Sequence, residues 1–333
     1  MKITFPHTTL LALCALAVAS SLTAQETSRP LRPTSTYSIV ARDSETGQLG
    51  VAVQSHWFSV GSIVSWAQPG VGAVATQSFV EVTYGPLGLQ HMRAGKTATQ
   101  ALTALLAGDE HPEVRQVAMV DARGNVAVHT GENAILEYCD HAGEGYSVQA
   151  NLMLAPTVCS AMVEAFESAT GDLAERMMVA LEAAQADGGD IRGKQSAALL
   201  VVTNDASLPA WGGRVFDLRI EDHPEPIREL RRLLTLARAY NHMNAGDEYF
   251  AAGEIEKAVE AYAKATELVP DNHEVLFWEA VTLATVGRLE ESLPLFKKAF
   301  EMWPDWRELV QRLPASEQLP DDPELMQQIL SVE

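Results

Sequence analysis

A threonine at the start of a predicted β-hairpin is the residue of this chain best suited to nucleophilic chemistry. Thr36 opens the stretch TYSIVAR, which is followed by a turn and a second apolar stretch, LGVAVQ. A threonine hydroxyl can attack an amide carbonyl if its own α-amino group, with a pKa of ~7.7–8.0, accepts the hydroxyl proton. That chemistry requires a cut between Ser35 and Thr36. Without the cut, Thr36 is merely the first residue of a strand, and the sequence leaves both interpretations open.

Other polar residues could bind a substrate near this threonine. The backbone N–H of Thr76, on a strand predicted to lie across from Thr36, could form an oxyanion hole, although a plain buried strand is the alternative. The candidates for substrate binding are found near strand ends or in a glycine-flanked loop, where functional side chains concentrate: Gln54, His56, Gln77, Asn151, Asp190, Arg192, Gln195 and Ser196. Each also has a structural explanation, such as turn formation or an ion pair that caps the loop.

Metal and nucleic-acid chemistry are not indicated. Asp217, Arg219, Asp222 and His223 alternate along a predicted edge strand, but they do not form an open three-ligand pattern, so we expect no metal and no cofactor. The net charge of −20 argues against binding to nucleic acid, which requires clustered lysine and arginine side chains. The same charge disfavours anionic membrane surfaces, and we interpret it as a contribution to solubility.

Strands that are flanked by helices must position these residues. Hairpins are predicted over 36–42 with 49–54, 62–67 with 72–77, and 116–120 with 125–129, followed by a short strand at 146–149 and strands at 196–203 and 215–221. Helices are predicted over 88–94, 97–107, 156–168 and 172–186, the second of them with a capping box at Thr97–Gln100. This order predicts an α+β domain with two stacked sheets between outer helices, a four-layer αββα sandwich.

A repeat follows from about residue 229. Two 34-residue units, 239–272 and 273–306, agree in phase: Gly253 with Gly287, Tyr262 with Phe296, Ala265 with Ala299, and Pro270 with Pro304. Small residues that allow helices to approach, aromatic residues between them and a final proline are typical of a tetratricopeptide repeat. We expect an all-α region that packs on 226–237 at one end and on a helix at 323–330 at the other.

The N-terminus has the pattern of an export signal. Lys2, an apolar run over 10–19 and the small residue Ala24 predict a signal peptide over 1–24 and therefore a periplasmic or secreted protein with no membrane contact after cleavage. The mature chain then contains two cysteines, Cys139 and Cys159. In an oxidising compartment they could form a disulfide, or they could be two small buried hydrophobic residues.

Several motifs in order resemble a known family. Besides the two hairpins that contain Thr36 and Thr76, they are YGPLGL, GEGYSVQAN, GGDIRGKQSAALLV and FDLRIEDHP. Together they resemble an uncharacterised bacterial family, a domain of unknown function that is grouped by fold with the N-terminal-nucleophile (Ntn) hydrolases. The resemblance implies an Ntn-hydrolase-like αββα fold but no substrate. One departure is that no lysine lies between Lys2 and Lys96, whereas proteasome-type members of that fold have one near the nucleophile.

These observations predict four segments: a signal peptide (1–24), a linker or pro-segment (25–35), an Ntn-hydrolase-like domain (36–225) and a tetratricopeptide-like domain (226–333). The first functional hypothesis is an exported amidohydrolase that acts on a small amide or peptide-like bond. The alternative is a non-catalytic ligand-binding or scaffold protein with the same fold. In both, we expect the repeats to bind a protein or peptide partner, and a homodimer is the default assembly.

Overall fold

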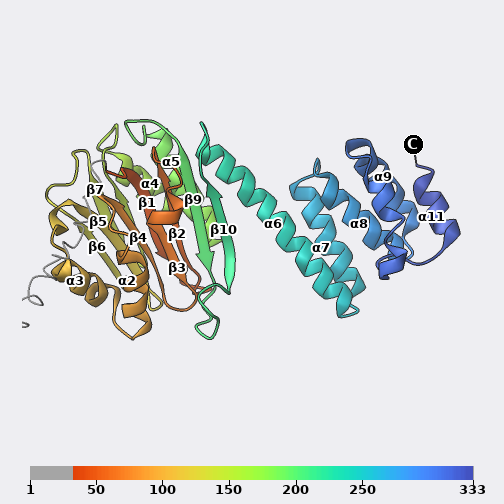
Figure 1. The fold of residues 1–333 in the computed structure, drawn as a ribbon, viewed down its shortest axis with the longest axis horizontal. Coiled ribbons are helices and arrows are strands. Elements are labelled where there is room, and N and C mark those ends of the chain that lie inside the picture. The colour runs from red at the N-terminus through yellow and green to blue at the C-terminus, as the bar shows by residue number, and fades with distance from the viewer. Residues whose placement is uncertain (1–32, 333) are drawn as a thin grey trace, which may run out of the picture. The chain divides into compact units, whose positions relative to one another are not determined.

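The computed structural model describes residues 33–332 as an α+β sheet region followed by a helical region (Figure 1). The structure therefore confirms the predicted order of the two regions, an α+β domain followed by an all-α repeat region. The predicted signal peptide over 1–24 lies outside the described residues. So does the segment 25–32 of the predicted linker. Within residues 33–332, no helix combines the length and the apolar character needed to cross a membrane.

The larger sheet has six antiparallel strands in the order β10-β9-β2-β1-β8-β7. These strands are β1 (Thr36–Arg42), β2 (Leu49–Ser55), β7 (Cys139–Gly143), β8 (Tyr146–Ala150), β9 (Ser196–Val202) and β10 (Arg214–Ile220). β1 lies between β2 and β8, with Thr36 opposite Ser55. This register places the first residue of β1 and the last residue of β2 at the same end of the sheet.

The smaller sheet has four antiparallel strands in the order β3-β4-β5-β6. They are β3 (Ser65–Gln68), β4 (Gly72–Ser78), β5 (Arg115–Asp121) and β6 (Val126–Thr130). Every residue of β4 and β5 is buried, as is expected for strands that are covered on both faces.

Three apolar clusters define four layers. Between the sheets lie residues such as Val40, Val53, Ala75 and Ala118. The outer face of the larger sheet packs on α4 (Val158–Ser168), α5 (Leu173–Ala186) and the start of α6 (Pro226–Ala251). The outer face of the smaller sheet packs on α2 (Tyr84–Arg93) and α3 (Ala98–Gly108). The capping box predicted for α3 is confirmed, with Thr97 and Gln100 bonded reciprocally.

The first strand of the second hairpin is shorter than predicted and is preceded by a helical turn. We expected a strand over 62–67, but the chain forms a short helix, α1 (Gly61–Val64), before β3 starts at Ser65. Ser59 turns the backbone with a φ of 55°, and the Ser65 hydroxyl donates to the carbonyl of Gly61 over 2.7 Å. These local serine bonds compete with strand pairing and favour the helical turn.

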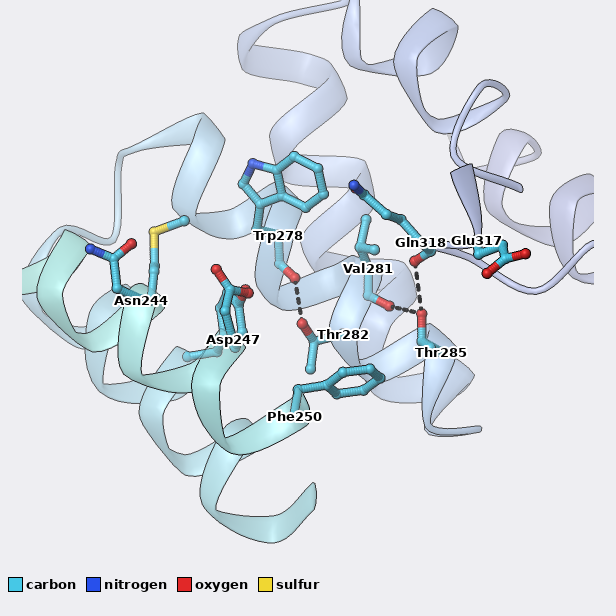
Figure 2. A pocket seen from close by; sticks show the side chains of 11 residues that line it. Asn244, Asp247, Phe250, Trp278, Val281, Thr282, Thr285, Glu317 and Gln318 are labelled. Carbon is cyan, nitrogen blue, oxygen red and sulfur yellow. Dashed lines mark hydrogen bonds between the residues drawn. The ribbon is translucent and has the colours of Figure 1, made fainter. Parts of the chain in front are cut away.

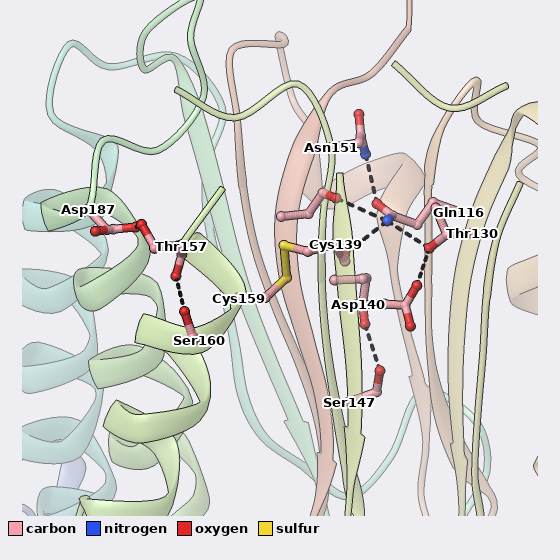
Figure 3. Close-up of a disulfide and its surroundings, with 12 residues drawn as sticks. Gln116, Thr130, Cys139, Asp140, Ser147, Asn151, Thr157, Cys159, Ser160 and Asp187 are labelled. Carbon is pink, nitrogen blue, oxygen red and sulfur yellow. Dashed lines mark hydrogen bonds between the residues drawn. A yellow bond between two sulfur atoms is a disulfide. The ribbon is translucent and has the colours of Figure 1, made fainter. Parts of the chain in front are cut away.

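Strand β7 was not predicted from the sequence. It forms an edge of the larger sheet, where three of its five residues are exposed, so it lacks the apolar alternation by which strands are recognised. Cys139, its first residue, forms a disulfide with Cys159 on α4, with their Cα atoms 6.1 Å apart (Figure 3). The bond ties this edge strand to the helix layer. Of the two alternatives for these cysteines, the structure contains the disulfide.

The helical region is built from α6, α7 (Ile255–Leu268), α8 (His273–Thr285) and α9 (Leu289–Met302). Gly246 lies on α6 where an added Cβ would be 2.7 Å from the Tyr262 ring, so only glycine permits this approach of α6 and α7. In the next pair, the rings of Phe277 and Phe296 meet edge to face at 5.9 Å. Two short helices, α10 (Trp306–Val310) and α11 (Pro323–Leu330), follow and add side chains to the core of the second pair.

Candidate functional site

Thr36 lies at the sheet end where β1 begins and β2 ends. Its side chain is fully buried, and its hydroxyl donates to the carbonyl oxygen of Thr34 over 2.6 Å. Its own carbonyl accepts the N–H of Asn151 over 3.1 Å and a weaker bond from the side-chain amide of Gln77 over 3.3 Å. The threonine is thus part of a polar interior and not of the apolar core between the sheets.

A chain of buried side-chain hydrogen bonds crosses between the sheets beside Thr36. Gln149 of β8 donates to the hydroxyl of Ser38 over 2.5 Å, and Ser38 donates to Gln77 of β4 over 2.6 Å. Gln77 in turn donates to Gln116 of β5 over 2.7 Å, and Asn151 donates to the same Gln116 oxygen over 2.9 Å. Figure 3 shows the last of these bonds, with the Gln116 nitrogen reaching toward β7 and β8. Buried networks of this kind fix the relative position of the layers that they join.

Buried polar atoms without a partner also gather at this end. Within residues 33–332, six buried side-chain N or O atoms have no hydrogen-bond partner, and five of them belong to Ser35, Gln54, Ser78 and Asn151. Gln54 lies opposite Tyr37 on β1, and Ser78 lies opposite Thr34. A buried polar group that is not hydrogen-bonded costs roughly 1–3 kcal/mol. Such a concentration at one place is typical of a site that binds something polar.

The carbonyl of Ser35, which precedes Thr36, is held by two donors. Its oxygen accepts the hydroxyl of Ser55 and the guanidinium of Arg192, the latter over 3.0 Å. The Arg192 guanidinium is itself fixed by two bonds to the fully buried carboxylate of Asp190, at 2.7 and 3.0 Å. Gly193 follows with a φ of 109°, a conformation that glycine alone adopts readily. The loop therefore holds a cation against the Ser35–Thr36 peptide bond.

The end of β4 contacts the same segment. Thr34 and Ser78 form an antiparallel bridge in which the Thr34 N–H donates to the Ser78 oxygen over 2.7 Å and the Ser78 N–H donates to the Thr34 oxygen over 3.1 Å. Thr76, two residues earlier, lies opposite Val117 on β5, and its hydroxyl donates to the carbonyl of Glu81. The backbone N–H that faces the segment before Thr36 is that of Ser78, and an oxyanion role for Thr76 stays a prediction.

The remaining predicted site residues lie farther from the centre of this network. His56 has an exposed side chain, and its N–H donates to Asp190 over 3.1 Å. The side chain of Gln195 donates to Asp222. Ser196 lies opposite Ser55, but its hydroxyl bonds the carbonyl of Trp57 and the N–H of Val60, which fixes the chain that follows β2. These hydrogen bonds give the three residues a structural role, and a role in substrate binding stays a prediction.

Four polar residues of this site were not predicted from the sequence: Ser55, Ser78, Gln116 and Gln149. Ser55 could have been found, because the turn between β1 and β2 sets a register that places Thr36 opposite it. Ser78 has a left-handed φ of 69°, which the sequence does not reveal in a serine. Gln116 and Gln149 lie on different sheets, and their meeting depends on how the sheets stack.

A buried ion pair anchors the chain that leaves Ser78. Arg115 donates to the carbonyl of Phe79 over 2.6 Å and to both oxygens of Asp109, at 2.7 and 3.1 Å. Burial by itself would raise the pKa of the Asp109 carboxyl, but the hydrogen bonds from Arg115 outweigh it and hold this pKa below its usual value. Burial raises the pKa of the Tyr84 phenol, which donates to the same carboxylate. The pair stays ionised and positions the end of β4.

Metal ligands do not cluster in the described part of the chain. No group of three or more histidine, cysteine, aspartate or glutamate side chains in residues 33–332 could hold a metal ion. Asp217, which was considered as a ligand, instead forms ion pairs with Arg214 and Arg219.

A second candidate site lies in the helical region (Figure 2). It is a pocket of about 470 Å³ whose walls come from α6, α7, α8 and the chain near Glu317. Phe250 and Trp278 present rings at its wall, and Asp247 and Glu317 contribute carboxylates. The residues that line it include no lysine or arginine. Its chemistry suits an apolar or basic side chain of a partner.

The comparison with known families agrees with this two-part architecture. The model of a family of unknown function, DUF1028, matches residues 36–230, and a TPR repeat model matches residues 246–287. The chain belongs to the DUF1028 family. In this member, a sheet domain of the DUF1028 family is followed by a tetratricopeptide-type repeat, and the repeat suggests interaction with proteins.

A solved structure has the same family domain. The chain is similar to a crystal structure of a protein from Silicibacter pomeroyi whose title assigns it to DUF1028. The two share 30% sequence identity and a TM-score of 0.54, and the match covers 61% of this chain and 89% of the other. No curated protein matches the chain.

Proposed function

We propose that the DUF1028 domain of this protein is an amidohydrolase of the N-terminal-nucleophile type, with Thr36 as the nucleophile after the Ser35–Thr36 bond is cut. The observation that carries the proposal is the pair of donors, Ser55 and Arg192, on the carbonyl oxygen next to Thr36. Such donors stabilise the negative charge that develops on a carbonyl oxygen under attack. The family match begins at Thr36, which leaves residues 33–35 outside the shared domain.

The reaction needs few groups. The Thr36 hydroxyl oxygen attacks the carbonyl carbon of a substrate amide, and the hydroxyl proton passes to the free α-amino group of Thr36. The amide C–N bond breaks, the leaving amine takes that proton, and an ester to Thr36 remains. Water hydrolyses the ester, which releases the acid and restores the hydroxyl. The guanidinium of Arg192 supplies the positive charge that a lysine would provide in a proteasome-type site.

Export is part of the same proposal. The disulfide between Cys139 and Cys159 supports a location outside the reducing cytosol, in the periplasm or the medium. The helical region would bind a protein or peptide partner there, or a second copy of the chain, through the pocket that includes Asp247 and Trp278. The acidic lining supports a partner segment with basic or apolar side chains.

Mass spectrometry of the protein from its native host tests the proposal. We expect a mature chain that begins at Thr36 and hydrolyses members of a panel of peptide amides. Thr36→Ala should abolish this hydrolysis, because methyl cannot attack a carbonyl. Thr46→Ala, in an exposed turn, is the matched control and should leave the rate unchanged. A mature chain that retains Ser35 and hydrolyses none of the amides would favour the non-catalytic binding protein. A Thr36→Ala variant that still hydrolyses the amides would exclude Thr36 as the nucleophile.

A further inference from the structure

The three residues before Thr36 lie in contact with the candidate catalytic groups along their whole length. The carbonyl of Pro33 accepts from Arg192 over 3.3 Å, and that of Ser35 accepts from Arg192 and Ser55. The N–H and the carbonyl of Thr34 pair with Ser78. All three carbonyls and one N–H of this tripeptide are thus hydrogen-bonded to the domain.

The groups that hold the tripeptide are fixed independently of it. Asp190 fixes Arg192 and is itself held by the N–H of His56. Arg115 anchors the carbonyl of Phe79, the residue directly after Ser78. Ser55 belongs to β2, which pairs with β9 as well as β1. If the tripeptide left, these donors and acceptors would remain in place and would be unpaired, so another chain of the same chemistry could take its position.

The side chains define which residues fit. Ser35 is fully buried and Thr34 is 3% exposed, so neighbouring residues enclose the side chains of the two residues that precede the scissile bond. The Ser35 hydroxyl has no partner among residues 33–332, and this enclosed position therefore accepts a small side chain without demanding a polar one. A bulky side chain there would have to displace buried strand residues.

We infer that Ser78, Arg192 and Ser55 form the acyl-side subsites for an extended peptide, and that residues 33–35 are a built-in occupant of them. This inference rests on the proposed function and names its substrate class: peptides with a small residue on the carbonyl side of the cleaved bond. The substrate pairs with Ser78 as a one-residue extension of the smaller sheet. Because the occupant is tethered, its effective concentration reaches the millimolar range, and it excludes free peptide while the Ser35–Thr36 bond is intact.

Peptide binding to the intact full chain tests the inference without any catalysis. All chains carry Thr36→Val, which keeps the shape of the side chain and prevents any self-cleavage through the hydroxyl. One chain also carries Thr34→Pro, which removes the N–H that donates to Ser78 and so weakens the occupant. The probe is fluorescein-labelled Pro-Thr-Ser-amide, followed by fluorescence polarisation. Its matched control is the same peptide with a methyl group on the threonine amide nitrogen.

We expect the probe to bind the Thr34→Pro chain about ten-fold more tightly than the parent chain, since a lost buried backbone hydrogen bond releases the subsite. The N-methyl probe should bind the Thr34→Pro chain about ten-fold more weakly than the unmethylated probe does. Arg192→Ala in the Thr34→Pro chain should abolish binding, while Arg214→Ala in the same chain should not, and thermal unfolding should show that all variants are folded. Equal binding to both chains, or no effect of N-methylation, would overturn the inference. Failure of the proposed function would appear separately, in the mature N-terminus and in the hydrolysis assay.

Discussion

The sheet domain and the helical region differ in where they bury polar groups. In the sheet domain, buried amide and hydroxyl side chains gather where β1 begins and β4 ends, and several of their atoms have no hydrogen-bond partner among residues 33–332. In the helical region, Glu279, Thr282 and Ser292 are the buried polar residues within the described chain, and the core is made of small and aromatic residues. The sheet domain thus concentrates its buried polar groups at one place, whereas the repeats have a core of small and aromatic residues beside an open pocket.

The largest expected effect concerns the ion pair of the sheet domain. Arg115→Ala leaves Asp109 as a buried carboxylate without its cation and should lower the free energy of unfolding by about 3–5 kcal/mol. Urea unfolding, with hydrogen exchange to locate the loss, measures it. Arg312→Ala is the control in the helical region, because its pair with Glu308 is exposed on both sides and should be worth less than about 1 kcal/mol.

The same pair predicts a dependence on pH. The pKa of Asp109 is lower in the folded state than its ordinary value, because the hydrogen bonds from Arg115 outweigh the effect of burial. The stabilisation is therefore complete above the ordinary aspartate pKa of about 3.9 and is lost as the pH falls toward the lower folded value. Between pH 6 and pH 3, the parent should lose more stability than Arg115→Ala. Parallel unfolding curves over this range would contradict the assignment.

Loss of the disulfide should have the next largest effect on stability. Replacement of both Cys139 and Cys159 by alanine opens a link across 20 residues and should lower stability by roughly 3 kcal/mol. The loss should appear as faster hydrogen exchange in β7 and α4, with α7 to α9 unchanged. If protection falls equally in the helical region, the two regions unfold as one unit and do not differ in their local stability.

The smallest effect is an expected gain in the helical region. Burial raises the pKa of Glu279, which lies on α8 and accepts a hydrogen bond from Thr266 of α7. A carboxyl with a raised folded-state pKa stabilises the fold when protonated and loses that contribution as the pH rises through the raised value. Glu279→Gln should therefore raise the free energy of unfolding at pH 7, where the parent carries a buried carboxylate, and should have less effect at pH 4. Glu290→Gln, at an exposed position, should leave the thermal midpoint unchanged.

Local signals predicted much of the fold. The carboxylate of Asp43 accepts the N–H groups of Glu45 and Thr46, and Gly47 has a φ of 71°, so the first hairpin is closed by residues next to one another in sequence. The repeat was recognisable because its small, aromatic and proline positions recur after 34 residues, as do Tyr262 and Phe296, which lie in the cores of the two helix pairs. The helix α1 and strand β7 were missed, since a serine-rich turn and an exposed edge strand do not show the periodicity of either element.

The site was less predictable because its contacts join distant segments. Thr36 was selected from the sequence, and so were Gln77, Asn151 and Arg192, which the structure brings to it or to its neighbours. The donors on the Ser35 carbonyl come from residues 55 and 192, and no local pattern states that they converge. Ser78 became apparent only through its pairing with Thr34. Sequence thus identified the nucleophile candidate, whereas the groups around it required the stacking of two sheets.

The helix α6 has a consequence for how the protein can be divided. It runs without interruption for 26 residues, about 39 Å at 1.5 Å per residue, and its first turns pack on the sheet domain while Gly246 belongs to the first repeat. The match to the DUF1028 family ends at residue 230, inside this helix. Limited proteolysis should therefore find no cutting site between the two regions unless α6 first unfolds, and a protein cut back to the family domain alone would end in a truncated helix.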